Sequence, residues 1–251
     1  MTTSLQILPQ APGVFLAADL VTGIVHWLED VFADESMPFI GRHVARTNIG
    51  HHHFPRHFTR LTWWQSSWLL CGLAAVFLLA AWCCGFLTWQ AWLFALLSAN
   101  ANEIHKWAHR TRAENGPAIT FLQNIRLLQT PRHHARHHTD PKDCHYCTIS
   151  NVLNPLLDRI NFWSGLERLV TRATGLRRRR DTSVAGQGPG PAWLADYRPR
   201  RAAPVAAGAC RPPNPVAPEI PGRAATTISQ PNARRGRACP RQSRCPEAVS
   251  Q

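Results

Sequence analysis

Leu61 to Asn102 reads LTWWQSSWLLCGLAAVFLLAAWCCGFLTWQAWLFALLSANAN, and these 42 residues include no charged side chain. The length is enough for two membrane spans of about 20 residues each. Gly85, Thr88 and Gln90 interrupt the apolar run and predict the turn between the two spans. The alternative is the buried helical hairpin of a soluble protein, but so long an uncharged stretch is rare outside membranes. The stretch therefore predicts an all-α integral membrane protein.

Basic residues flank the uncharged stretch on both sides. Arg56 and Arg60 precede it, and Lys106 and Arg110 follow it. By the positive-inside rule, both flanks are cytoplasmic. The formal net charge of +13 does not indicate nucleic-acid binding, because many of the other basic residues lie in the C-terminal tail rather than on a recognition surface. We therefore expect a multi-pass protein of a bacterial inner membrane or an ER-type membrane.

All 13 histidines lie within the first 145 residues, and most belong to three sets. The sets are His51–His53, His105 with His109, and the HHxxHH motif that starts at His133. Neutral imidazole is the commonest protein ligand of first-row transition metals. Two crossings between the first and second sets return the chain to the same side of the membrane, so all three sets can converge on one metal site at the cytoplasmic face.

Polar residues accompany these sets at helical spacing. From Pro12 to Phe32 the sequence predicts a membrane-embedded helix with Asp19, His26 and Asp30 on one face. Asn102 likewise shares a face with the second set. We expect Asp19, Asp30 and Asn102 to be outer partners that hold the ligands in place.

The number of histidines favours two metal ions over one. A single zinc ion takes about four protein ligands, whereas this sequence contains eight or nine candidate imidazole ligands. Sites rich in imidazole with open coordination positions suit iron and O2, while thiolates are nearly absent from the set. We expect no catalytic group beyond the ligands. They are His26, His51, His52, His105, His109, His134, His137 and His138, with His133 in reserve.

The composition changes after Arg180. Residues 181–251 are rich in Pro, Arg, Ala and Gly and poor in apolar side chains, which is typical of a disordered tail. The expected fold is thus a helical membrane bundle over residues 13–180, with a histidine-rich metal site on its cytosolic face, followed by a disordered tail over residues 181–251.

Five segments together resemble one family. They are DLVTGIVHWLED (19–30), GHHHFP (50–55), NEIHKWAH (102–109), PRHHARHHTDP (131–141) and HYCTISNVLN (145–154). They are similar to the plasmanylethanolamine desaturase (Kua/CarF) family of lipid desaturases, which is related to plant fatty acid desaturase 4. The resemblance covers residues 15–180, whereas the residues after Arg180 match no part of the family.

The resemblance implies a membrane di-iron desaturase that uses O2 and electrons from a carrier such as cytochrome b5 or ferredoxin. Its substrate would be an ether phospholipid, in which it forms the vinyl ether bond of plasmalogens from a 1-O-alkyl chain. The motif histidines of the family fall on the nine positions given above, from His26 to His138.

Two other functions remain open. The ligand set determines the oxidant and not the substrate, so an acyl-lipid desaturase or hydroxylase is one alternative. The other is a non-catalytic membrane protein that binds metal. A carrier would place polar residues through its spans, and the uncharged stretch offers few, which disfavours transport.

Overall fold

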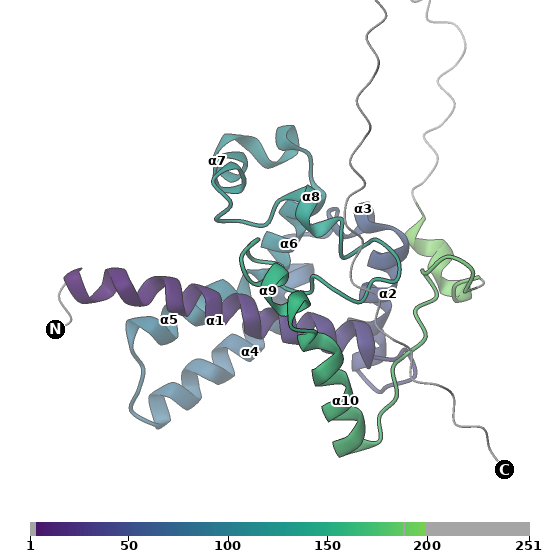
Figure 1. Cartoon of the computed structure of the whole chain (residues 1–251), viewed down its shortest axis with the longest axis horizontal. Coiled ribbons are helices and arrows are strands. Elements are labelled where there is room, and N and C mark those ends of the chain that lie inside the picture. The colour runs from purple at the N-terminus through teal and green to yellow at the C-terminus, as the bar shows by residue number, and fades with distance from the viewer. Residues whose placement is uncertain (1–3, 188, 199–251) are drawn as a thin grey trace, which may run out of the picture. The chain divides into compact units, whose positions relative to one another are not determined.

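In the computed structural model, residues 4–187 and 189–198 are described, and their regular structure is entirely helical (Figure 1). The absence of strands among these residues confirms the prediction of an all-α chain. The described residues all fall within one compact unit. Most of the expected tail, residues 199–251, lies outside the described part of the chain.

Helix α1 (Ser4–Val31) is the longest helix. It begins at Ser4 rather than at Pro12, and it ends one residue before the expected Phe32. Within the described residues two helical segments are long and apolar enough to cross a membrane, namely Gln10–Val31 of α1 and Trp63–Cys83. The C-terminal half of α1 carries His26 and Asp30, both of which are buried.

The uncharged stretch forms a hairpin whose two arms differ in length. Its first arm, α4 (Trp63–Cys83), begins with a capping box between Thr62 and Gln65. Its second arm starts with α5 (Trp89–Ala99), which has only 11 residues and is about 17 Å long at 1.5 Å per residue. The prediction that the second span of about 20 apolar residues forms a single helix is therefore wrong.

Helix α5 ends at its C-cap residue, Asn100. Its side chain donates to the carbonyl of Leu96 at 2.8 Å and so competes with the helical backbone hydrogen bonds. Asn100 has φ −98° and ψ 4°, and α6 (Ala101–His109) starts directly after it. Helices α4 and α5 pack against each other, and α5 also packs along α1 (Figure 1).

Residues 33–60, whose sequence is polar and basic, contain three helical segments. They are a π-helical turn η1 (Gly41–Ala45), α2 (Arg46–His53) and α3 (Pro55–Phe58). Helix α2 is buried over residues 48–52, so tertiary packing stabilises a helix that composition alone does not favour. A Cβ on Gly50 would lie 2.5 Å from the ring of Tyr197, so this close contact requires glycine.

The later helices are short. Helix α7 (Arg112–Asn124) is interrupted at Gly116, whose φ is 72°. Helix α8 (Pro131–His134) has four residues. Three further elements complete the described residues: α9 (Leu153–Arg159), α10 (Phe162–Thr174) and a 3-10 turn η2 (Ala192–Tyr197).

A buried segment without regular structure, residues 142–150, packs against α1. Asp19 holds it there, because its carboxylate accepts from the Ile149 amide at 2.9 Å and the Ser150 hydroxyl at 2.6 Å. Tyr146 packs with Trp27 and Trp163 in one core cluster. These contacts determine where the backbone carbonyls of this segment lie relative to the histidines of α1.

Candidate metal centre

Five histidines from three parts of the chain converge on one point. Helix α2 supplies His51, α6 supplies His105 and His109, and the segment that begins with α8 supplies His134 and His138. One ligand atom from each lies within 4.8 Å of the others. We call this set the five-histidine group.

The nitrogens of the five-histidine group have the spacing of metal ligands. His105 Nε2 lies 2.8 Å from His134 Nε2 and 3.2 Å from His109 Nε2, and His138 Nε2 lies 3.2 Å from His134 Nε2. One proton can bridge one pair of nitrogens, but the rings of His105 and His134 each face two neighbours. Nitrogen ligands about 2 Å from a shared ion lie about 3 Å from one another. The spacing therefore fits a transition-metal ion.

The protonation and hydrogen bonding of these side chains also fit a metal. Burial lowers the pKa of every histidine in the group, and that of His109 to about 3, so the rings are neutral at pH 7, as metal binding requires. His51 has both ring nitrogens buried with no hydrogen-bond partner among the described residues. Buried polar atoms rarely lack a partner, and a bound cation would supply one.

A second set combines three histidines with a carboxylate: His26 and Asp30 from α1, His52 from α2, and His137. All four are buried. Asp30 lies 3.2 Å from His52 Nε2, 3.1 Å from His137 Nε2 and 3.6 Å from His26 Nε2, and the Nε2 atoms of His52 and His137 are 3.3 Å apart. We call this set the carboxylate group. Its mixed nitrogen and oxygen donors suit iron.

Two outer nitrogens of the carboxylate group have hydrogen-bond partners, and the third faces a carboxylate. His26 Nδ1 lies 2.9 Å from the carbonyl of Tyr146, and His137 Nδ1 lies 2.9 Å from the carbonyl of Cys144. His52 Nδ1 faces a carboxylate oxygen of Asp181 at 3.6 Å. For His26 and His137, an Nδ1–H held by a carbonyl leaves Nε2 unprotonated and fixes the ring orientation.

The carboxylate group holds an excess of negative charge near His52. Burial lowers the pKa of His52, but the carboxylates of Asp30 and Asp181 outweigh it and raise this pKa to about 9. A proton on His52 therefore balances the buried carboxylates when no metal is bound. A metal cation would replace that proton.

The two groups lie next to each other. His51 and His52 are consecutive residues that belong to different groups, and their ring centroids are 5.7 Å apart. His26 and His105, again one from each group, have centroids 5.1 Å apart. The arrangement can hold two neighbouring ions.

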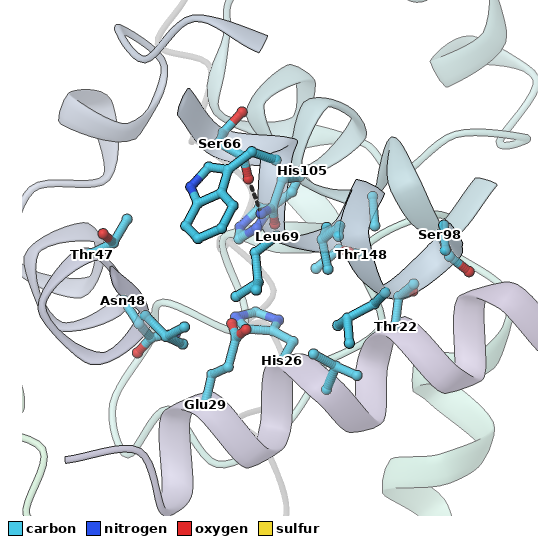
Figure 2. Close-up of a pocket in the computed structure, with 18 of the residues that line it drawn as sticks. Thr22, His26, Glu29, Thr47, Asn48, Ser66, Leu69, Ser98, His105 and Thr148 are labelled. Carbon is cyan, nitrogen blue, oxygen red and sulfur yellow. Dashed lines mark hydrogen bonds between the residues drawn. The ribbon is translucent and has the colours of Figure 1, made fainter. Parts of the chain in front are cut away.

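A cavity of about 420 Å³ borders both groups and extends between α1, α4 and α5. Figure 2 shows His26 and His105 at its wall, with Glu29 and Asn48 beside them. The far part is apolar and is lined by Leu73, Ala74, Phe77, Phe94 and Ala95. Pockets of this size take a small molecule or part of a larger one, and this wall suits a hydrocarbon chain.

The structure brings eight of the nine expected ligands into the two groups. His133 is the exception, because its Nε2 lies 3.3 Å from the Asn154 amide nitrogen and its ring packs against His145. The helix in which His133 and His137 would share a face ends at His134.

The expected outer partners lie in three different places. Asp30 is among the ligand atoms of the carboxylate group rather than behind them. Asp19 contacts residues 149 and 150, and Asn102 donates to the carbonyl of Ser66 at 2.6 Å. Sequence reasoning missed Asp181, which is distant in the chain from every ligand and falls in tail-like composition.

Comparison with known proteins gives consistent results. The family model of the lipid desaturase domain matches residues 15–181. The chain is 32% identical over 176 residues to a plasmanylethanolamine desaturase of Myxococcus xanthus, covering 66% of this chain and 61% of that protein. It is 30% identical over 192 residues to plasmanylethanolamine desaturase 1 of Mus musculus, covering 71% and 70%.

A plant relative and the solved structures complete the comparison. The chain is 30% identical over 172 residues to the chloroplastic fatty acid desaturase 4 of Arabidopsis thaliana, covering 66% of this chain and 52% of that protein. The matched part thus spans 61% of the length of the Myxococcus relative and about half of the plant one. No solved structure matches the chain.

Proposed function

Because the chain belongs to the lipid desaturase family, we propose that it is a membrane-bound di-iron desaturase that acts on a phospholipid. The observation that carries the proposal is the convergence of eight histidines and Asp30 in two adjacent groups beside an apolar cavity. The five-histidine group would hold one iron and the carboxylate group the other. Iron with nitrogen ligands and open positions for O2 supplies an oxidant for unactivated C–H bonds.

The protein's own residues would bind and align the substrate. The apolar wall formed by α4 and α5 would hold one hydrocarbon chain, while the polar head group stays outside the cavity. His26, His51 and His105 border the cavity, so the carbons nearest the head group would lie at the metal ligands. Desaturation removes two hydrogen atoms from the chain, and a carrier such as cytochrome b5 or ferredoxin supplies two further electrons, so that O2 and two protons from solvent become two waters.

We propose an ether phospholipid as the substrate, with conversion of its 1-O-alkyl chain to the vinyl ether of a plasmalogen. Support comes from two relatives that are named plasmanylethanolamine desaturases. The relative named fatty acid desaturase 4 supports a second candidate, an acyl-lipid desaturase. The same metal centre and cavity serve both reactions, because the two candidates differ in the chain linkage next to the head group.

The proposed setting is a multi-pass membrane protein with the metal centre on the cytoplasmic face. Candidate spans at Gln10–Val31 and Trp63–Cys83 support it. Arg56, Arg60, Lys106 and Arg110 lie at the end of the hairpin that is nearer the histidines, consistent with a cytoplasmic orientation.

Lipid analysis of a host without plasmalogens tests the activity. Cells fed an alkylglycerol and expressing the chain should release an acid-labile aldehyde from their lipids, whereas cells expressing the His105→Ala variant should not. New double bonds in ester-linked chains, without the aldehyde, would favour the acyl-lipid candidate. Purified protein with one zinc or one haem in place of two irons would overturn the di-iron assignment and favour a non-catalytic metal-binding protein.

A further inference from the structure

Residues 179–185, which we call the strap, contact all three parts of the chain that carry the carboxylate group. At the first, the strap binds the end of α1. The Arg179 amide donates to the carbonyl of Val31 at 2.6 Å, and the Arg179 guanidinium donates to the carbonyl of Asp30 at 3.0 Å. Asp30 is itself a member of the group, so the strap is attached directly at one ligand.

The second contact is with α2. Asp181 faces the Nδ1 atom of His52 at 3.6 Å, and the Thr182 hydroxyl lies 3.0 Å from Nε2 of the adjacent His53. Within the strap, Ser183 holds the carboxylate of Asp181. This carboxylate accepts from the Ser183 amide at 2.8 Å and the Ser183 hydroxyl at 2.6 Å. Its side chain is 19% exposed. Asp181 is therefore fixed in place rather than free in solvent.

The third contact is with the segment that follows His137. The Lys142 ammonium donates to the carbonyl of Ser183 at 3.0 Å, and the Ala185 amide donates to the carboxylate of Asp140 at 3.0 Å. Lys142 is buried. The strap thus links the parts of the chain that provide Asp30, His52 and His137, which are otherwise distant in sequence.

The three histidines of the carboxylate group need equivalent support on their outer nitrogens. A metal-bound imidazole donates its remaining N–H to a carbonyl or a carboxylate, and that partner fixes which nitrogen faces the ion. His26 and His137 have backbone carbonyls in this position. For His52 the group on this side is the carboxylate of Asp181, which faces Nδ1 at an ion-pair distance of 3.6 Å rather than in a hydrogen bond.

We propose that Asp181 is a positioning residue of the metal centre: it holds Nδ1 of His52 so that Nε2 faces the ion of the carboxylate group, and the strap keeps the ligand-bearing segments together. This inference rests on the proposed metal centre. It extends the centre into a segment whose composition is that of a tail.

Metal binding by the purified full-length protein tests the inference without reference to activity. Wild type, Asp181→Ala, Asp181→Glu and Asp181→Asn are loaded with Co²⁺, and the ion is then removed with increasing concentrations of a chelator while the visible absorption of Co²⁺ is followed. The matched control is Asp196→Ala, because Asp196 is an exposed carboxylate of η2 in the same C-terminal segment. Thermal unfolding of each metal-free protein is measured in parallel.

Asp181→Ala should release one of two ions at a chelator concentration about 10- to 100-fold lower than wild type. The second ion should be retained as in wild type. Asp181→Glu should restore binding, and Asp196→Ala should match wild type. Retention of both ions by Asp181→Ala, or loss of both together with a lower melting temperature, would overturn the inference. Wild type that holds no metal would instead overturn the metal centre itself.

Discussion

His133 and His134 are neighbours in the chain, but their imidazoles have different surroundings. His134 is almost fully buried among the five-histidine group, and its Nε2 faces the Nε2 atoms of His105 and His138. His133 lies outside both groups, where it contacts Asn154. Comparing substitutions at these two residues therefore distinguishes a metal ligand from a histidine that only lies nearby.

We expect His134→Ala to lose one of two bound ions and to lower activity at least about 100-fold, because removing a ligand is more severe than removing its outer partner. His133→Ala should retain both ions and most of the activity. Metal content per chain and product formation by membranes measure the two effects. Equal losses in both variants would show that the ligand assignment at this motif is wrong.

A second residue-scale prediction concerns pH. Burial lowers the pKa of His109 to about 3 and that of His133 to about 4, whereas a histidine in the unfolded chain binds a proton near pH 6.5. Unfolding therefore takes up protons between about pH 6.5 and 3, and the folded state loses stability as the pH falls through that range. His52 has the opposite sign, since its raised pKa of about 9 favours the folded state below pH 6.5 and this contribution is lost as the pH rises through 9.

Histidines with a lowered pKa outnumber those with a raised pKa among the described residues. The melting temperature of the metal-free protein in detergent should therefore fall steadily from pH 7 to pH 5. A melting temperature that is constant over this range would contradict the burial of neutral histidines. Replacement of His52 by Gln should remove the loss of stability between about pH 6.5 and 9 while leaving the acid-side loss in place.

The short helices explain which parts of the site the sequence could predict. Residues four apart in a helix lie on the same face. His134 and His138 follow this rule, since their Nε2 atoms are 3.2 Å apart. The rule fails for His133 and His137, because α8 ends after four residues and the turn that follows sends His137 to the carboxylate group. The candidate ligands could be predicted from residue type, but the division into two groups depends on where a helix ends.

Other features had no local signal. The contact of Asp181 with His52 joins residues 129 positions apart, and a Pro- and Arg-rich composition gives no indication of it. The early end of α5 depends on one asparagine side chain, which an average over an apolar window does not detect. By contrast, the uncharged stretch and the histidine sets were sufficient for the helical class and for the convergence of ligands.

At the scale of the helix, α4 offers a test of the cavity. Ala74 lines it, whereas the adjacent Ala75 is exposed and does not line it. Ala74→Phe would place a ring in the space proposed for the hydrocarbon chain, where overpacking costs about 1 to 3 kcal/mol. We expect turnover of a long-chain lipid to fall about tenfold or more, with the metal content unchanged.

Ala75→Phe is the matched control, since it adds the same side chain to the same helix outside the cavity. It should keep wild-type turnover. A shorter-chain lipid should be affected less than a long-chain one by Ala74→Phe, because less of the chain reaches the apolar wall. Equal loss in both variants would indicate a general effect on α4 and would contradict the placement of the substrate chain.

At the scale of the whole molecule, the two metal groups together require that α2, α6 and the segment that begins with α8 face the same side of the membrane. One ion cannot be shared by ligands on opposite sides of a bilayer whose hydrocarbon core is about 30 Å thick. The turn between α4 and α5, at residues 84–88, lies at the other end of the hairpin from His105. The proposed topology therefore places residues 42 and 139 on one side and residue 87 at the opposite end of the spans.

Single cysteines at Arg42, Thr139 and Leu87, all exposed positions, test this arrangement in a background without native cysteines. In sealed inside-out vesicles, an impermeant thiol reagent should label Arg42→Cys and Thr139→Cys, because basic flanks place that face in the cytoplasm. Leu87→Cys should react only after the vesicles are opened, or remain protected if α5, with its 11 residues, leaves the turn within the bilayer. Opposite-side labelling of Arg42→Cys and Thr139→Cys would make a joint metal centre impossible, and the di-iron proposal would fail with it. If both residues react only after the vesicles are opened, the centre would be preserved but would face the other compartment, and an electron donor would then have to act from there.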